Sequence, residues 1–231
     1  MDQPFRIRVA GENTFIIYFS NIIDDSVAAL LPAVVEVLQQ RLAGVLVDLV
    51  PAYGSVLVVF DVLRISPQEL RKRIRSSLLS LNAVSTQQTR HIQLPVYYGE
   101  EVGIDLPQIS EHAGLPVDEV IALHQAGIYR VYAIGFAPGF AYLGSVDTRI
   151  AMPRLVSPRA QVPKGAVAIA DRQTAVYPAA SPGGWHIIGR CPTLMFSLDE
   201  HVLPSMPVAV GDTVQFYAID REQFLAMGGE L

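Results

Sequence analysis

Residues 134–144 read IGFAPGFAYLG, and residues 181–190 read SPGGWHIIGR. Both stretches set glycine and proline beside large aromatic side chains. Glycine reaches backbone angles that other residues avoid, and proline fixes φ near about −65°. We therefore expect neither stretch to form a regular helix or a central strand. Stiff, irregular loops on a scaffold commonly build a pocket, here with Phe136, Phe140, Tyr142 and Trp185 as walls.

A basic segment lies between these two stretches. Residues 153–165 read PRLVSPRAQVPKG, in which Arg154, Arg159 and Lys164 each directly follow a proline. Two convergent arginines suit a carboxylate or a phosphate, because the guanidinium fork pairs with two oxygens. Gln173 offers both a donor and an acceptor for an amide. A solvated basic loop or an intrachain salt bridge is the alternative interpretation of the same residues.

Around these motifs, residues 91–231 are rich in short β-like runs punctuated by proline and glycine. Helical patterns are confined to 106–113, which Gly114 ends, and to 117–125. This pattern predicts a closed or folded-over β barrel with irregular loops. The expected strands are 129–134, 166–170, 175–177, 185–188, 194–196 and 214–218.

Residues 1–84 predict a smaller unit with the order ββαββα. Strands are expected at 5–9, 14–19, 45–50 and 55–60. One helix starts near Asp24 or Asp25, and a second follows the capping-box pattern at 66–69 and runs to Leu81. An antiparallel sheet with two helices on one face is broadly ferredoxin-like. The polar segment 82–90 is the expected linker, so the fold class is α+β.

Composition narrows the function classes. The chain has 231 residues, 51% of them hydrophobic and 17% charged, with a net charge of −5. These values predict a substantial core and argue against nucleic acid as a partner. No apolar run reaches membrane-helix length, the start of the chain is too polar for a signal peptide, and Cys191 is the single cysteine. We therefore expect a cytoplasmic protein without a membrane partner.

Common cofactor signatures are missing from the sequence. It contains no GxxxxGK[ST] phosphate loop, no GxGxxG, no GxSxG elbow and no HExxH. The five histidines show no metal-ligand spacing, so no metal site is predicted. His112 and His124 are interpreted as ordinary helix residues, and Cys191 as a small buried thiol.

Taken in order and spacing, IGFAPGFAYLG, MPRLVSPRAQVPKGAVAIADRQTAVYP and SPGGWHIIGR resemble the 5-oxoprolinase B-subunit (PxpB) family, also called KipI-like or allophanate hydrolase subunit 1-like. PAYGS at 51–55 and PVYYG at 95–99 extend the resemblance over nearly the whole chain. The resemblance implies an N-terminal α/β domain, 1–84, and a cyclophilin-like β-barrel domain, 91–231. It also implies a heteromer with homologues of the 5-oxoprolinase C and A subunits, which opens 5-oxoproline to glutamate at the expense of ATP with Mg.

The resemblance implies a site around the motifs. Within it, Arg154, Arg159 and Gln173 are the expected catalytic residues, while an acid–base pair cannot be identified and is expected from the A or C subunit. The expected substrate-binding residues surround them: Phe136, Pro138, Gly139, Phe140, Tyr142, Lys164, Pro182, Gly183, Gly184, Trp185 and His186. The glycine pair could instead form a β-bulge or a hairpin turn.

The chain departs from the family pattern at Lys164, Asp171, Arg172 and His186, where the family commonly carries other residues. These departures indicate a changed loop backbone and an altered ligand preference. Two other functions stay open at this point. One is inhibition of a histidine kinase, as in the KipI branch. The other is a part of a urea carboxylase or allophanate hydrolase-type carboxyltransferase. Neither the stoichiometry nor the location of the ATP site follows from the sequence.

Overall fold

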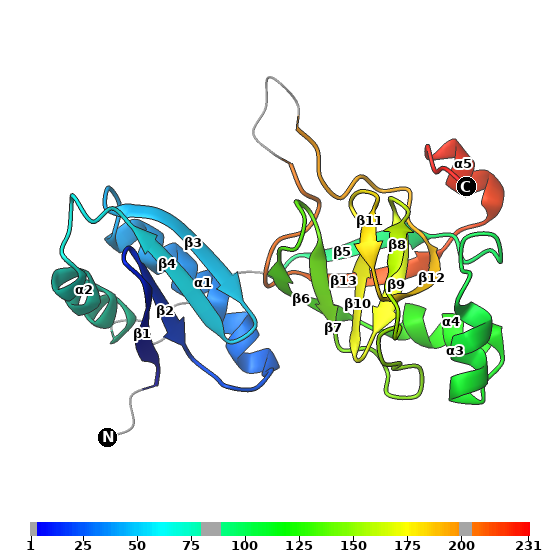
Figure 1. Cartoon of the computed structure of the whole chain (residues 1–231), viewed down its shortest axis with the longest axis horizontal. Helices are drawn as coiled ribbons and strands as arrows, with labels where there is room; N and C mark the ends of the chain where they lie inside the picture. Colours follow the sequence, from blue (N-terminus) through cyan, green and yellow to red (C-terminus); the bar gives the residue numbers. More distant parts are fainter. Residues whose placement is uncertain (1–3, 80–88, 199–204) are drawn as a thin grey trace. The chain divides into compact units, whose positions relative to one another are not determined.

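A computed structural model describes residues 4–79, 89–198 and 205–231 of the chain (Figure 1). The chain divides into two compact units, Met1–Thr89 and Arg90–Leu231. Within the described ranges, no helix has both the length and the apolar character that crossing a bilayer requires. Of the predicted linker 82–90, only residues 89 and 90 fall inside these ranges.

The first unit is a four-stranded antiparallel sheet with two helices, as the sequence predicted. Its sheet order is β1-β2-β4-β3. Ferredoxin-like domains have the chain order βαββαβ, whereas this unit begins with two strands, so the layers are similar and the ferredoxin-like name stays a prediction. The elements are β1 (Arg6–Gly11), β2 (Thr14–Tyr18), α1 (Asp25–Arg41), β3 (Leu46–Ala52), β4 (Ser55–Phe60) and α2 (Pro67–Leu79).

Alternation along the strands places the core of this unit on one face of the sheet. Phe15 and Ile17 of β2 are buried together with Val56, Val58 and Phe60 of β4. Both helices pack their apolar stripes against this face, through Leu31, Val34 and Leu38 of α1 and Leu70, Ile74 and Leu78 of α2. The predicted helix starts are confirmed, because Asp24 accepts from the backbone of α1 and the Ser66 hydroxyl accepts from Glu69 N at 3.3 Å.

The second unit is built on a curved sheet in the order β5-β13-β6-β7-β10-β9-β12. Among the described strands of this sheet, only β5 and β13 run parallel. The two edge strands meet at a single bridge, where Tyr97 and Arg190 exchange backbone hydrogen bonds of 2.9 and 2.8 Å. No continuous ladder joins these edges, so the described strands do not form a closed barrel. Of the predicted closed or folded-over barrel the closed form is therefore wrong, and the cyclophilin-like name stays a prediction.

The two predicted helices of the second unit are confirmed, and a third helix, at residues 221–226, was not predicted. Its elements are β5 (His91–Val96), α3 (Leu106–Ala113), α4 (Val117–Ala126), β6 (Tyr129–Ile134), β7 (Ala141–Gly144), β8 (Arg159–Val162), β9 (Ala166–Ala170), β10 (Gln173–Val176), β11 (Ser181–Gly183), β12 (His186–Arg190), β13 (Thr213–Ala218) and α5 (Arg221–Ala226). Strands β8 and β11 pair as a separate two-stranded sheet.

Besides the closed barrel, two predictions for individual segments of this unit were wrong. Residues 141–144 form β7, a central strand between β6 and β10, although the stretch was expected to be irregular. The turn at 137–140 already contains the proline and the glycine, so the following residues are free to pair. Conversely, no strand forms at 194–196, and Ser197 contributes only an isolated bridge to Ser205.

Strand β9 separates two cores and explains how an aromatic cluster fits beside the sheet. Its sequence AVAIA is buried on both faces. Val167 and Ile169 face the main core, which the helices α3 and α4 cover. Ala166, Ala168 and Ala170 face a second cluster that contains Phe140, Tyr177 and Trp185. The alanine face leaves room for these large rings, because successive strand residues point to opposite faces.

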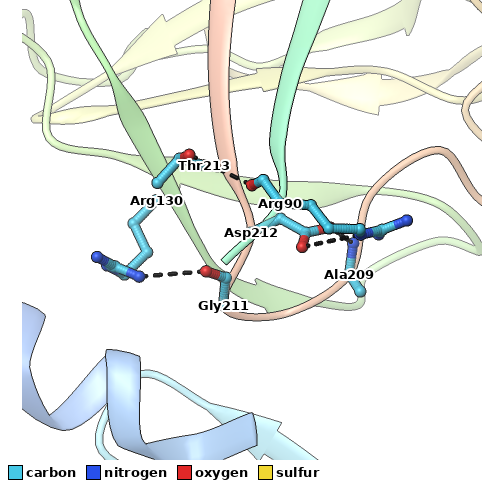
Figure 2. Close-up of polar contacts among 6 residues, drawn as sticks. All are labelled: Arg90, Arg130, Ala209, Gly211, Asp212 and Thr213. Atoms are coloured by element: carbon cyan, nitrogen blue, oxygen red, sulfur yellow. Dashed lines mark hydrogen bonds and ion pairs between the residues drawn. The ribbon is translucent and has the colours of Figure 1, made fainter. Parts of the chain in front are cut away.

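The start of the second unit is fixed by a buried carboxylate. Asp212, which precedes β13, accepts from the guanidinium of Arg90 and, at 2.7 Å, from the backbone N–H of Ala209 (Figure 2). The Thr213 N–H donates to the carbonyl of Arg90 at 2.9 Å, and Arg130 donates to the carbonyl of Gly211 at 3.1 Å. These bonds hold the first residues of β5 beside the first residues of β13.

His124 of α4 is a core residue rather than a surface one. Its Nε2 lies 3.0 Å from the Thr174 hydroxyl, which donates to the carbonyl of Ala168 and therefore accepts from the histidine. Nδ1 then accepts from the Tyr98 hydroxyl at 2.8 Å, and the ring stacks on Phe216. Burial lowers the pKa of His124 from 6.5 to about 3, so the neutral imidazole is the native form.

We expect acid to weaken the fold through His124. The His124 imidazole takes up a proton near pH 6.5 in the unfolded chain, but only near about pH 3 in the folded chain. The neutral ring therefore contributes fully to the free energy of unfolding above about pH 6.5. This contribution is lost as the pH falls toward about 3, by up to about 1.4 kcal/mol per pH unit. Urea unfolding at several pH values should show a smaller slope in His124→Gln, whereas His112→Gln, at a histidine outside the core, should keep the wild-type slope. Equal slopes in all three proteins would contradict this assignment.

Candidate functional site

An aromatic cluster centred on Phe140 joins the two motifs from which the sequence analysis began. The Phe140 ring makes edge-to-face contacts with Phe136 at 5.3 Å, Tyr142 at 4.9 Å, Tyr177 at 5.2 Å and Trp185 at 5.7 Å between centroids. Aromatic pairs of this geometry contribute about 0.5–1.5 kcal/mol each beyond area burial. The cluster is therefore a rigid wall, held from the 135–140 loop, β7, the end of β10 and the start of β12.

A pocket of about 230 Å³ opens on this wall. It contains most of the residues that the sequence predicted for substrate binding, together with Pro158 and Tyr177, which sequence reasoning missed. Tyr177 gave no separate signal because it is one of nine tyrosines and stands outside both glycine-rich motifs. The lining residues are Phe136, Phe140, Tyr142, Arg154, Pro158, Tyr177, Pro182, Gly183, Gly184 and Trp185.

Arg154 is the cation of this pocket. Its guanidinium carbon lies 5.7 Å from the centre of the Trp185 ring, a cation–π arrangement that orients a planar cation over an indole. Within the described residues Arg154 forms no ion pair. No ion pair therefore occupies its N–H donors, and the binding of an anionic group by Arg154 stays a prediction.

Gly183 is needed because of Tyr177. A Cβ built at position 183 would lie 2.3 Å from the Tyr177 hydroxyl oxygen, so any larger residue would displace the ring. The β8–β11 ladder also shifts register between Ser181 and Gly183, as in a β-bulge. Of the interpretations that the sequence left open for the glycine pair, the bulge is therefore supported, and at Gly183 the close neighbour is the Tyr177 side chain.

Phe136 stands on strained backbone at the mouth of the pocket. Its φ is 75°, in the left-handed region, and 65% of its surface is exposed. A bulky residue in this region costs of order 1–3 kcal/mol, and such residues cluster at functional sites. An exposed aromatic ring held at this cost is therefore a candidate ligand contact.

We expect Phe136→Gly to leave the free energy of unfolding within about 1 kcal/mol of wild type. Glycine relieves the strained φ, and this gain offsets the lost ring contact with Phe140. Phe140→Ala is the matched comparison: that ring is buried, so its loss should cost about 3–5 kcal/mol. Chemical denaturation of both variants checks this. A loss of more than about 2 kcal/mol in Phe136→Gly would assign Phe136 to the structural wall.

Arg159 contacts a carboxylate and does not line the pocket. Its Nη2 lies 2.7 Å from Oδ1 of Asp105, and its Nη1 donates to the carbonyl of Trp185 at 3.4 Å. The other Asp105 oxygen accepts from the Ile187 N–H at 2.6 Å. Asp105 is the N-cap residue of α3, so this ion pair joins α3, β8 and β12. The intrachain salt bridge, left open by the sequence, is what forms.

His186 and Gln173 lie outside the pocket lining. His186 is buried, and its Nε2 donates to the carbonyl of Pro153 at 2.9 Å, which holds the residue before Arg154 in place. Gln173 opens β10 and pairs with Gly144 and Ala170. It follows the β9–β10 turn, where Asp171 takes a φ of 52° that aspartate tolerates better than most residues. The turn therefore forms without a glycine at position 171.

The remaining predicted residues shape or border the site. Pro138 is exposed in the turn, and Gly139 has a φ of 83° with no space for a Cβ, which would lie 2.5 Å from the carbonyl oxygen of Met195. This turn delivers Phe140 to the cluster. Lys164 lines a different cavity, together with Arg190 and Cys191.

Comparison with known proteins agrees with the motifs. The family model described as carboxyltransferase domain, subdomain C and D, matches residues 5–205 of this chain. A relative from Bacillus subtilis (strain 168), the B subunit of 5-oxoprolinase, is 34% identical over 236 residues, which cover 98% of each chain. The chain belongs to the 5-oxoprolinase B-subunit family. The resemblance that the sequence showed is confirmed.

Solved structures extend the family comparison. TTHA0988 is 33% identical with a TM-score of 0.77, over 93% of this chain and 40% of that chain. The chain thus spans about two fifths of that longer solved chain. The K. lactis urea amidolyase has a TM-score of 0.77 at 17% identity, over 96% of this chain and 15% of that chain, which shows a shared fold alone.

Proposed function

We propose that this chain is the B subunit of an ATP-dependent 5-oxoprolinase, a complex that opens 5-oxoproline to L-glutamate. The observation that carries the proposal is the match with the Bacillus subtilis 5-oxoprolinase chain over 98% of both sequences. The pocket supports it. 5-Oxoproline is a small lactam ring with one carboxylate, and the pocket combines aromatic walls with one guanidinium that lacks an ion-pair partner among the described residues.

In this proposal the lining residues bind and orient the substrate. Arg154 pairs with the carboxylate, and the rings of Phe140 and Trp185 exclude water from the lactam. Burial raises the pKa of Tyr177, so its hydroxyl stays protonated and can donate to the lactam oxygen. The lining contains no carboxylate or imidazole that could act as a base. Another polypeptide of the complex supplies that group.

We place ATP outside this pocket. A volume of about 230 Å³ lies below the roughly 300–1,000 Å³ of pockets for larger ligands, and one arginine is the only cation in the lining. The described residues also contain no group of three or more acidic, histidine or cysteine side chains that could hold a metal ion. We propose that ATP and its Mg bind to another polypeptide of the complex.

The proposed partners are homologues of the 5-oxoprolinase C and A subunits. In TTHA0988 the region similar to this chain is covalently joined to further sequence, which supports association of this unit with other polypeptides. A carboxyltransferase role is the second candidate, favoured by the family model that matches residues 5–205. A biotin carboxylase encoded beside this chain would favour it, and genes for the A and C subunits there would favour the 5-oxoprolinase.

Co-purification tests the proposed assembly. We expect the chain to co-elute with its C-subunit homologue in size-exclusion chromatography after co-expression, and to show no ATP-dependent release of glutamate when it is purified alone. The reason for the second result is that the pocket lining contains no carboxylate or imidazole and that we place ATP on another polypeptide. Turnover by the isolated chain would contradict the assignment of these functions to other polypeptides, and separate elution at micromolar concentration would contradict the heteromer.

A further inference from the structure

A second cavity lies between the end of β12 and the C-terminal segment 224–230. Its volume is about 50 Å³. Since about 10–15 Å³ holds one water molecule, this space corresponds to a few waters or to one small oxyanion. Its lining includes side chains from four separate stretches of the chain, among them Lys164, Tyr177, Arg190, Thr193, Phe224 and Glu230.

The positive charge in this cavity is not neutralised by a contacting carboxylate. Nε of Arg190 is buried without a hydrogen-bond partner, while Nη1 donates to the backbone carbonyl of Glu230 at 2.6 Å. Burial lowers the pKa of Arg190, and the nearby Glu230 carboxylate opposes that shift. Lys164 forms no ion pair with any described residue. A partly buried cation with an unpaired donor is costly unless a counter-charge is supplied.

We propose that this cavity binds a small oxyanion, with inorganic phosphate and bicarbonate as the two sources of the same chemistry. The Arg190 guanidinium supplies one positive charge to the lining, and the Lys164 ammonium contributes a second positive charge from the rim. Thr193 adds a hydroxyl to the lining. Cys191 contributes no charge, because burial raises the pKa of its thiol.

The C-terminal segment covers the site and is firmly held. Phe224 of α5 is fully buried and stacks on Tyr97 at 5.5 Å, and Arg221 pairs with Glu101 at 3.2 Å. Glu230 therefore stays close to Arg190, where its carboxylate competes with an incoming anion. The site does not depend on the aromatic pocket, although Tyr177 borders both.

Isothermal titration of the whole chain with sodium phosphate, and separately with sodium bicarbonate, tests the site at fixed ionic strength. We expect saturable one-to-one binding of at least one anion. Lys164→Ala should weaken it by about ten- to a hundredfold, the usual effect of losing a charge-assisted bond. Lys72→Ala is the matched control, since Lys72 is exposed on α2 and is the only other lysine of the chain.

Two further variants separate this site from its neighbours. Glu230→Gln should bind the anion several-fold more tightly, because a competing charge is removed. Arg154→Ala should bind it as wild type does, so failure of the 5-oxoprolinase proposal would leave this result untouched. No saturable binding of either anion, or equal weakening in Lys164→Ala and Lys72→Ala, would overturn the proposal.

Discussion

Replacing Arg159 with alanine should lower the free energy of unfolding by about 3 kcal/mol. The substitution leaves the Asp105 carboxylate buried, with the Ile187 N–H as its remaining donor. Removing one partner of a buried ion pair typically costs about 3–5 kcal/mol. The Arg159 side chain is 28% exposed and that of Asp105 is 7% exposed, so water recovers part of the loss and the lower end of the range applies.

Arg149→Ala is the matched control for this prediction. Arg149 also pairs with an aspartate at 2.7 Å, but the side chains of Arg149 and Asp147 are 56% and 33% exposed. Exposed pairs contribute about 0–1 kcal/mol, so this variant should unfold close to wild type. Urea titrations of both proteins at neutral pH make the comparison. If Arg159→Ala stays within about 1 kcal/mol of wild type, the Asp105–Arg159 pair does not hold α3 to β12.

Arg154→Ala should reduce kcat/KM of the assembled enzyme for 5-oxoproline by about ten- to a hundredfold while leaving the fold intact. Losing a charge-assisted bond to a carboxylate costs about 1.5–3 kcal/mol. The carboxylate is not the reacting group of the lactam, so most of the loss should appear in KM. The stability cost is limited to the cation–π contact with Trp185, about 0.5–1 kcal/mol at an exposed site.

Arg172→Ala provides the control for Arg154. Arg172 is exposed in the β9–β10 turn and is absent from the pocket lining. Arg172→Ala removes one positive charge from the same unit as Arg154→Ala does. Any effect of net charge on substrate attraction is therefore the same in the two variants. Steady-state kinetics that are indistinguishable between the two variants would remove Arg154 from the substrate site.

The comparison of Arg154 with Arg159 shows where sequence reasoning stops. Both arginines lie in one proline-stiffened segment, and the sequence predicts the same role for both. Their roles differ because Asp105, 54 residues earlier in the chain, lies within reach of Arg159 alone. A partner at that separation is set by the packing of α3 against β12, and periodicity or spacing in the sequence cannot reveal it.

Local signals predicted local features well. Capping at Asp24 and Ser66 marked the starts of α1 and α2, and the glycine and proline motifs marked the residues that line the aromatic pocket. Strands β8 and β11 went unpredicted because three or four residues among prolines carry too little alternation. Each of these strands forms by pairing with the other, and this contact joins segments that are distant in the sequence.

Reconstitution of the complete enzyme tests the central claim most directly. Homologues of the A and C subunits from the same source would be purified with and without this chain, and glutamate formed from 5-oxoproline would be measured with ATP present and absent. We predict glutamate only when this chain and ATP are both present. Full activity without the chain, or no glutamate from the complete set of folded polypeptides, would contradict its assignment as the B subunit of a 5-oxoprolinase.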